Sequence, residues 1–406
     1  MDRGDRWLVA ALAGTVVGAA LALHGLLAPA GSGPPREQLG RAPSPGVRWR
    51  LDRASESGTV VALTGGVAVE ALTGSSGSGP VLEARDLTTG TRRWRTPLLP
   101  GVLVRAGGVL VAYRPAAVEW MGPGPALAAY DLATGRRLWQ RDAPDDRAMV
   151  LLAGGPDDDF AVLDDARPGR QGELSLRDAR TGQRRWTAPL PAGCTSTDPS
   201  SPQPGTAAVT RWILVAARCS GRTVVLQFPV AGGAPVRSVA LPGPVARIRS
   251  QDGDPAVVET GDATRTLIDQ GSATARPAGP SLEGPPARVV SVCGSHVLLR
   301  PDGAQLVVAD SADLAPRWRT APVTLVADPA CTADRLVTVD QDPRDDRARR
   351  LVTYALADGT ATVTPLVTPV GGATQFGVRA VDGATAVTAR SPGSGETLWL
   401  VGPPGA

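Results

Sequence analysis

The chain has no lysine, no asparagine and only two histidines among its 406 residues. Because histidine is the commonest general base near neutral pH, this leaves little material for nucleophilic catalysis, while paired carboxylates for sugar hydrolysis stay open. Every basic residue is an arginine, a bias that we attribute to a GC-rich coding sequence rather than to a function. The net charge is only +3 and acidic residues are interspersed with the arginines, so the concentrated basic face of a nucleic-acid-binding protein is missing.

Aromatic residues are also scarce, at 4%, whereas glycine (48) and proline (38) are abundant. Outside a collagen period such a composition can indicate disorder. Here the glycines and prolines lie between short apolar runs, where turns would fall. The pattern therefore favours an all-β protein with many short strands.

One long uncharged stretch stands apart, at Trp7–Ala28. As a helix it would span about 33 Å, enough to cross the hydrocarbon core of a bilayer. Arg3 and Arg6 precede it, so we predict a transmembrane anchor (7–28) with a cytoplasmic tail (1–6) and an extracytoplasmic remainder. A signal peptide cleaved near Ala28–Ala30 is the alternative. Residues 29–46, rich in glycine, proline and serine, are predicted to be a flexible linker.

A short motif returns three times, at Asp86–Trp94, Asp131–Trp139 and Asp178–Trp186. Each copy has an aspartate, a glycine four residues later and a tryptophan four residues beyond that. A glycine in the left-handed conformation suits a hairpin turn, and the aspartate can accept hydrogen bonds from the turn backbone. We predict that each tryptophan lies on the outermost strand of its unit and covers the joint with the next unit.

The repeat predicts the architecture of residues 47–402. The third strand of each unit is expected to begin near residues 82, 127, 174, 224, 265, 306, 351 and 397, a spacing typical of propeller repeats. Trp49, in Val47–Leu51, has no preceding strands of its own. Pairing Val47–Leu51 with Thr397–Val401 would close a ring and remove its free edges. The prediction is an eight-bladed β-propeller, with seven blades as the alternative.

The motif aliphatic-x-Ala-x-Asp-x-x-Thr-Gly-x-x-x-Trp resembles the PQQ-type propeller repeat. That repeat occurs in quinoprotein alcohol dehydrogenases and in the propeller lipoprotein of the bacterial outer-membrane assembly complex. The resemblance implies the architecture rather than the chemistry. The dehydrogenases use an adjacent Cys–Cys disulfide and a calcium site with asparagine, and this chain has neither. The expectation is therefore a non-enzymatic member without a cofactor.

The four cysteines, Cys194, Cys219, Cys293 and Cys331, all lie in the part expected outside the cytoplasm, which favours two disulfides. The first two are expected on the first and second strands of one unit. The other two are expected just after the first strands of consecutive units. We predict the pairs 194–219 and 293–331; the other pairings and free buried thiols stay open. The spacings fit no zinc site.

The remaining candidate groups suggest no reaction. His296 begins an apolar strand, which favours a structural role over that of a general base. Three acidic clusters could offer oxygen ligands to calcium, but solvated hairpin tips are the simpler interpretation; they are Asp157–Asp159, Asp164–Asp165 and Asp340–Asp346. We therefore predict no catalytic, cofactor-binding or metal-binding residue.

The expected function is that of a membrane-tethered, non-catalytic scaffold, monomeric, which binds a protein or another cell-envelope partner and no nucleic acid. The alternative is an extracytoplasmic small-molecule sensor, or a propeller enzyme with a site in its central channel. Loops on a rigid scaffold commonly carry binding. The predicted binding surfaces are Ala116–Pro125, Thr195–Gly205 and Asp340–Arg350.

Overall fold

A computed structural model describes residues 38–402, apart from residues 41–45, 54–55, 75–78, 115–125, 143–148, 156, 165–170, 197–210, 234–236, 250–255, 261–264, 269–274, 278–287, 301–304, 343–344, 367–374, 382 and 392–394. The regular structure of the part described is entirely β-strand. The predicted anchor, Trp7–Ala28, lies outside this part, and no helix within it has the length and hydrophobicity needed to span a bilayer.

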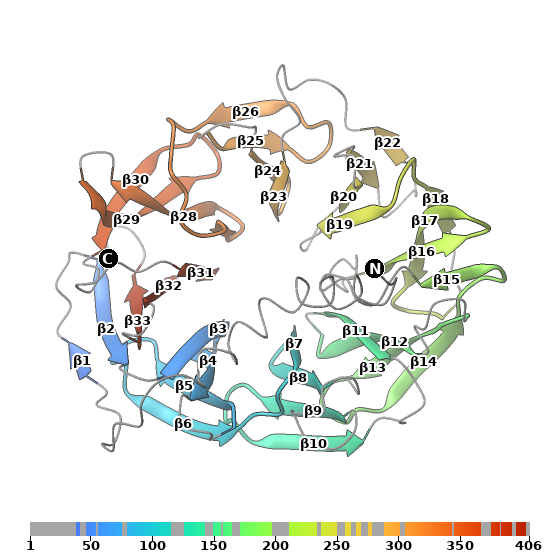
Figure 1. Cartoon of the computed structure of the whole chain (residues 1–406), viewed down its shortest axis with the longest axis horizontal. Coiled ribbons are helices and arrows are strands. Elements are labelled where there is room, and N and C mark those ends of the chain that lie inside the picture. Colours follow the sequence, from blue (N-terminus) through green and yellow to red (C-terminus); the bar gives the residue numbers. More distant parts are fainter. Residues whose placement is uncertain are drawn as a thin grey trace, which may run out of the picture.

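The strands form separate antiparallel sheets arranged around a ring (Figure 1). Seven sheets have four consecutive strands each. The first three are β3 (Glu56–Thr64), β4 (Val67–Gly74), β5 (Val81–Asp86) and β6 (Arg92–Pro97); β7 (Val102–Ala106), β8 (Val109–Arg114), β9 (Ala126–Asp131) and β10 (Arg137–Asp142); and β11 (Met149–Gly154), β12 (Asp159–Asp164), β13 (Glu173–Asp178) and β14 (Arg184–Pro189).

The next four sheets continue around the ring in the same order. They are β15 (Cys194–Ser196), β16 (Trp212–Cys219), β17 (Arg222–Pro229) and β18 (Arg237–Ala240); β19 (Val245–Arg249), β20 (Ala256–Thr260), β21 (Arg265–Ile268) and β22 (Ala275–Pro277); β23 (Arg288–Cys293), β24 (His296–Arg300), β25 (Val307–Asp310) and β26 (Pro316–Arg319); and β27 (Ala330–Cys331), β28 (Arg335–Asp342), β29 (Asp345–Ala355) and β30 (Ala361–Leu366).

The remaining sheet joins the two ends of the chain, and we call it the closing sheet. Its strand order is β1 (Gln38–Gly40), β2 (Val47–Arg53), β33 (Gly395–Val401), β32 (Ala384–Ser391) and β31 (Gln375–Val381). Leu51 pairs with Leu398, and the Thr397 hydroxyl lies 2.6 Å from an Asp52 carboxylate oxygen. The predicted pairing of Val47–Leu51 with Thr397–Val401 is therefore confirmed.

The all-β propeller is confirmed. Its sheets can be compared with the two predicted blade counts, seven and eight. The seven-blade alternative corresponds to the seven sheets made of four consecutive strands. The closing sheet, which takes strands from both chain ends, is the additional one in the count of eight. The third strands β5, β9, β13, β17, β21, β25, β29 and β33 fall at or near the predicted starts, although β29 begins six residues early because its hairpin is longer than expected.

The prediction that residues 29–46 form a flexible linker was wrong at Gln38–Gly40. These residues form β1, antiparallel to Arg50–Asp52 of β2. The physical reason is that β2 would otherwise be the outer edge of the closing sheet, with unpaired backbone N–H and C=O groups. A short edge strand can pair with these backbone groups without an apolar sequence pattern of its own. The composition of residues 29–46 therefore did not indicate a strand.

The repeated aspartates cap the turns as predicted. Asp86 accepts hydrogen bonds of 2.8 Å from the backbone N–H groups of Thr88 and Thr89, and Gly90 adopts a left-handed φ of 71°. An ion pair with Arg93 and these backbone bonds hold the pKa of Asp86 well below its usual range. The same turn geometry recurs at Asp131, Asp178 and Asp310.

Each tryptophan of the motif docks onto the turn of the next blade. Trp94 Nε1 donates to Ala133 O at 3.0 Å, and a Cβ on Gly135 would lie only 2.3 Å from the indole. The turn glycine thus permits close approach as well as positive φ. Equivalent bonds are Trp49 to Leu87 O, Trp139 to Ala179 O, Trp186 to Val230 O and Trp318 to Leu356 O. The predicted role of the tryptophan at the inter-blade joint is confirmed.

One turn replaces the glycine and shows why the others keep it. Leu314 occupies the glycine position of the β25–β26 turn, with φ of 61°, and is buried against Leu267 of the preceding blade. That preceding blade ends in β22, which carries no tryptophan. The leucine side chain therefore occupies the joint that an indole covers elsewhere, which offsets the backbone strain of a non-glycine residue at positive φ.

The ring has two faces that differ in their connections. On one, which we call the turn face, lie the Asp–Gly turns and the connections between first and second strands. On the other, the loop face, second strands connect to third strands. In the β3–β6, β7–β10, β11–β14, β19–β22 and β23–β26 sheets the first strand lies nearest the ring axis, and in the closing sheet the innermost strand is β31 (Figure 1). Buried apolar side chains pack mainly between neighbouring sheets, so the core is divided among the joints of the ring.

Candidate functional site

The structure describes one of the three predicted binding surfaces and part of another. Ala116–Pro125 lies outside the described residues, and of Thr195–Gly205 only Thr195 and Ser196 are described. Asp340–Arg350 is a β-hairpin rather than a loop, because β28 and β29 pair as far as Asp342 and Asp345. It reaches the loop face, where β8 also ends and β9 begins.

An ion pair joins the two strands of this hairpin. Arg350 Nε and Nη2 lie 2.7 and 3.0 Å from the two carboxylate oxygens of Asp340, which is completely buried. The hydrogen bond to Asp340 raises the pKa of Arg350. The Arg349 guanidinium carbon lies 5.9 Å from the ring centroid of Phe376 in β31. Interpreting Asp340 as part of a solvated tip was therefore wrong.

The acidic cluster at Asp157–Asp159 binds arginines and backbone. Asp158 accepts from Gly108 N at 2.8 Å and pairs with Arg180 at 2.6 Å, joining neighbouring blades. Asp159 is buried and lies 2.9 Å from Arg185, so it also differs from the solvated side chain that we expected. Within the described ranges, no three His, Cys, Asp or Glu side chains are grouped to hold a metal ion.

The structure contains both predicted disulfides. Cys194 of β15 is bonded to Cys219 of β16, its direct cross-strand partner. Cys293 and Cys331, at the ends of β23 and β27, join the first strands of consecutive blades. One bond thus pins the start of the predicted surface Thr195–Gly205, and the other ties two blades together near the ring axis.

These two bonds give a direct chemical prediction. Peptides from a non-reduced digest of the protein should contain the crosslinks 194–219 and 293–331, because each pair is already within bonding distance in the fold. Mass spectrometry before and after reduction measures this. Four alkylated cysteines without prior reduction, or crossed pairs such as 194–293, would contradict the assignment.

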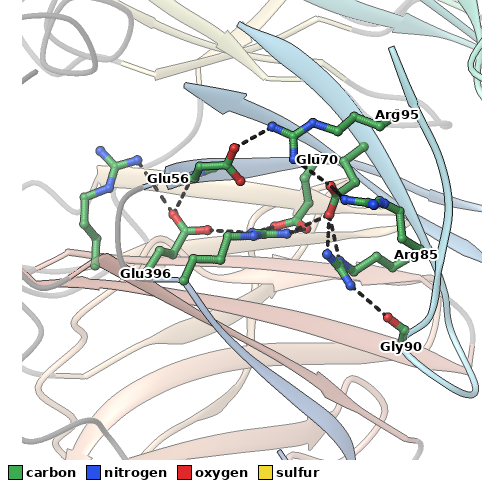
Figure 2. Close-up of polar contacts among 11 residues, drawn as sticks. Glu56, Glu70, Arg85, Gly90, Arg95 and Glu396 are labelled. Atoms are coloured by element: carbon green, nitrogen blue, oxygen red, sulfur yellow. Dashed lines mark hydrogen bonds and ion pairs between the residues drawn. The ribbon is translucent and has the colours of Figure 1, made fainter. Parts of the chain in front are cut away.

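The most unusual group of side chains lies at the seam between the closing sheet and the β3–β6 sheet (Figure 2). We call it the seam cluster, and its centre is Arg53 with Glu70, Glu83 and Glu396. Arg53 donates to both oxygens of Glu70, at 3.0 and 2.7 Å, and reaches Glu83 at 3.2 Å and Glu396 at 3.5 Å. All four side chains are at most 1% exposed.

A second layer of groups completes the seam cluster. Glu83 also accepts from Arg85 Nε at 2.8 Å and from Arg95 Nη1 at 3.3 Å. Gly58 N donates to Glu396 at 2.6 Å, and Arg390 lies 3.7 Å from the same carboxylate. Arg95 further pairs with Glu56, and Arg92 lies 3.8 Å from Glu83. Every carboxylate of the cluster therefore has an arginine partner.

The pKa values in the seam cluster reflect competing causes. Burial, followed by the negative charge of Glu70, raises the pKa of Glu396 to about 8, while the Gly58 N–H and the charges of Arg53 and Arg390 oppose the rise. Burial opposes protonation of Arg53, but the adjacent glutamates outweigh it and raise the pKa of Arg53. Arg53 is therefore a permanent cation, and Glu396 can exchange a proton near neutral pH.

This arrangement predicts a pH dependence of folding. In the unfolded chain Glu396 ionises near 4.5, so between about 4.5 and 8 the folded chain holds a proton that the unfolded chain has lost. The stabilisation is complete below pH 4.5 and is lost as the pH rises through 8. Between pH 5.5 and 8.5 the wild type should lose about 2–3 kcal/mol more unfolding free energy than Glu396→Gln. Denaturant titrations measure this, with Glu173→Gln as control; parallel curves for wild type and Glu396→Gln would contradict it.

Sequence reasoning missed the seam cluster. The available signal was a charge inside an apolar strand: Glu70 within Val67–Leu72 of β4, and Glu83 within β5. Such a residue suggests a buried partner. The partners, however, come from β2 and β33 at opposite ends of the chain, and no local pattern connects them.

The one histidine of the described residues, His296, lies beside a serine and an aspartate. Ser295 Oγ lies 3.4 Å from His296 Nδ1, and Asp310 is the cross-strand partner of His296. However, the Asp310 carboxylate oxygens accept hydrogen bonds from Ala312 N at 2.8 Å and from Arg317 Nη2 at 2.6 Å. Among the described residues, Asp310 forms no hydrogen bond with the imidazole. A serine activated by a histidine requires that third group to orient the ring. The placement of His296 fits the structural role that we predicted.

Comparisons with known proteins agree with this architecture. The family model described as outer membrane protein assembly factor BamB matches residues 41–270. No curated protein has a sequence that matches the chain. Among solved structures, the computationally designed Ika8 protein is similar with a TM-score of 0.55 and 13% identity, over 86% of this chain and 98% of that one. At this identity the likeness concerns the fold alone.

Two natural proteins are similar over comparable lengths. BamB from Moraxella catarrhalis has a TM-score of 0.47 and 14% identity, covering 85% of this chain and 98% of that one. The quinohemoprotein alcohol dehydrogenase from Comamonas testosteroni has a TM-score of 0.48 and 12% identity, covering 87% and 76%.

Proposed function

Because the chain belongs to the family of the outer membrane protein assembly factor BamB, we propose that it is a membrane-tethered, extracytoplasmic propeller that binds a protein of the cell envelope and catalyses no reaction. The family match over residues 41–270 is the observation that carries the proposal. PQQ-like repeats also occur in enzymes, so the non-catalytic assignment needs support from the chain's own residues.

Two features of the chain support an envelope location. Two disulfides are stable only in an oxidising compartment, such as the space outside the cytoplasmic membrane. The uncharged stretch Trp7–Ala28, preceded by Arg3 and Arg6, has the sequence of an anchor that leaves the propeller on the far side of the membrane. Together they favour a propeller held close to the outer surface of that membrane.

The loop face is the side that we assign to the partner. The β28–β29 hairpin reaches it, and its Asp340–Arg350 ion pair holds the hairpin in one conformation before binding. A preorganised surface loses less conformational entropy on association. Among the described side chains, the exposed large hydrophobic residues are Val102 and Val363, each 50% accessible. The contact is therefore expected to be mainly polar.

Site-specific crosslinking in native membranes tests the proposal. A photoreactive amino acid at Gln341, on the hairpin, should yield one defined adduct with an envelope protein. The same amino acid at Thr134, exposed on the turn face, is the matched control and should yield none. Recovery of the uncrosslinked monomer alone from Gln341 and further loop-face positions would overturn the proposal.

A small-molecule sensor is the second candidate, and one observation favours it. Two exposed arginines without a described carboxylate partner lie on first strands of the ring, where a ligand near the axis could reach them. In that case a stabilising metabolite, rather than an envelope protein, would accompany the purified chain.

A further inference from the structure

The strands nearest the ring axis carry an excess of positive charge. The first strands of the eight sheets contain a single acidic residue, Glu56, and it is engaged by Arg95 in the seam cluster. The same strands contain five arginines, which are Arg105, Arg247, Arg249, Arg288 and Arg379. The chain's net charge is only +3, so this excess of arginine is a property of the first strands rather than of the whole sequence.

Two of these arginines lie on either side of β3. Arg105 is on β7 and Arg379 is on β31, and β3 contacts both strands. Both side chains are exposed, and the Nε of each donates a hydrogen bond to a backbone carbonyl. Arg105 Nε donates to Gly107 O at 3.0 Å, and Arg379 Nε donates to Val60 O at 3.2 Å. The Arg379 side chain thus contacts the backbone of β3.

Neither arginine forms an ion pair with a carboxylate in the described part of the chain. This contrasts with Arg53, Arg177 and Arg350, which all bind carboxylates. Arg379 keeps access to solvent but has protein around most of its guanidinium, and this partial desolvation lowers its pKa, as does the positive charge of Arg105. The two cations are therefore close enough to repel each other.

An anion placed between two such cations would relieve this repulsion. The backbone bonds engage only Nε of each guanidinium, so Nη1 and Nη2 of both side chains can donate to a ligand. Thr59, which precedes Val60 on the intervening strand β3, is exposed and offers a hydroxyl. Guanidinium groups bind carboxylate and phosphate with paired hydrogen bonds. Two cations match the charge of a phosphate near neutral pH, whereas a carboxylate would leave one cation uncompensated.

We propose that Arg105, Arg379 and Thr59 form a binding site for a phosphate group, carried by a small molecule that enters the ring near its turn face. The site is independent of the loop-face contact in the proposed function. It is also distinct from the seam cluster, whose carboxylates exclude an anion.

Calorimetry on the full-length chain in a mild detergent tests the site. Inorganic phosphate, glycerol phosphate and acetate are titrated separately at constant ionic strength. Phosphate or its ester should bind with a stoichiometry of one, and acetate at least about tenfold more weakly. Tighter binding of glycerol phosphate would identify a phosphate ester as the natural ligand, and tighter binding of inorganic phosphate would identify the free anion.

Variants connect the binding to these residues. Arg105→Gln and Arg379→Gln should each weaken phosphate binding about tenfold or more, and the double variant should abolish it. Arg136→Gln removes an exposed charge from the β9–β10 turn and should bind like the wild type. Thermal melts establish that the variants fold. The variants Arg105→Lys and Arg379→Lys keep the positive charge but lack the planar guanidinium, so they separate the effect of charge from that of paired hydrogen bonds. No heat from either phosphate probe at 20 mM, equal binding of acetate, or undiminished binding in a folded double variant would overturn the proposal.

Discussion

Replacing Arg53 by methionine should lower the free energy of unfolding by about 3–5 kcal/mol at pH 8. The substitution leaves Glu70, Glu83 and Glu396 buried without their shared cation, and a buried charge that loses its partner is strongly destabilising. Methionine fills similar space, so the loss is mainly electrostatic. Denaturant-induced unfolding, followed by tryptophan fluorescence, measures the change.

The same variant should be less impaired at low pH. Without Arg53 the glutamates can relieve their repulsion by taking up protons, so the cost should shrink as the pH falls from 8 to 5. Arg93→Met is the matched control, because the Arg93–Asp86 pair is exposed and should cost less than about 1 kcal/mol. A cost for Arg53→Met that is similar to this control, or independent of pH, would contradict the role given to the seam cluster.

Replacing Trp49 by alanine should cost about 3–5 kcal/mol. Its indole is 3% exposed, packs between the closing sheet and the β3–β6 sheet, and donates to Leu87 O at 3.2 Å. Removing it leaves a cavity beside the closing sheet, in which β2 and β33 from opposite ends of the chain are held together by noncovalent pairing. Thermal and denaturant unfolding both measure the loss.

A matched replacement separates the closure from an ordinary joint. Trp94→Ala removes the same group at a joint between blades that follow each other in the chain, and Trp94 is more exposed than Trp49. Trp94→Ala should therefore cost less. If Trp49→Ala costs under about 1 kcal/mol, or less than Trp94→Ala, the indole is not holding the closure.

The sequence was sufficient to predict the ring because its repeat is read locally. Each Asp–Gly–Trp copy specifies a turn and an outer strand, and Trp49 without its own preceding strands indicated which segment completes the closing sheet. The predictions failed for features that depend on a free sheet edge or on residues distant in the sequence. Gln38–Gly40 became β1 because β2 offered an unpaired edge, and Asp340 became buried because the β28–β29 pairing continued past the expected turn.

The seam cluster was beyond prediction for a related reason. Arg53 and Glu396 are 343 positions apart in the sequence, and their meeting depends on the ring closing in the observed register. The same holds for Arg105 and Arg379. The local sequence around each arginine indicates only a strand, and closure of the ring places the two strands on either side of β3. Local patterns predict the blades, whereas the charged groups at their joints emerge from the closure.

The closure is thus the central claim, and hydrogen exchange of the backbone amides of Val47–Arg53 tests it most directly. If β2 pairs with β33, these amides should exchange as slowly as those of the inner strand β8, and Thr397–Val401 should be protected to the same degree. Rapid exchange of Val47–Arg53 in a chain whose other strands remain protected would contradict the closed ring and, with it, the seam cluster.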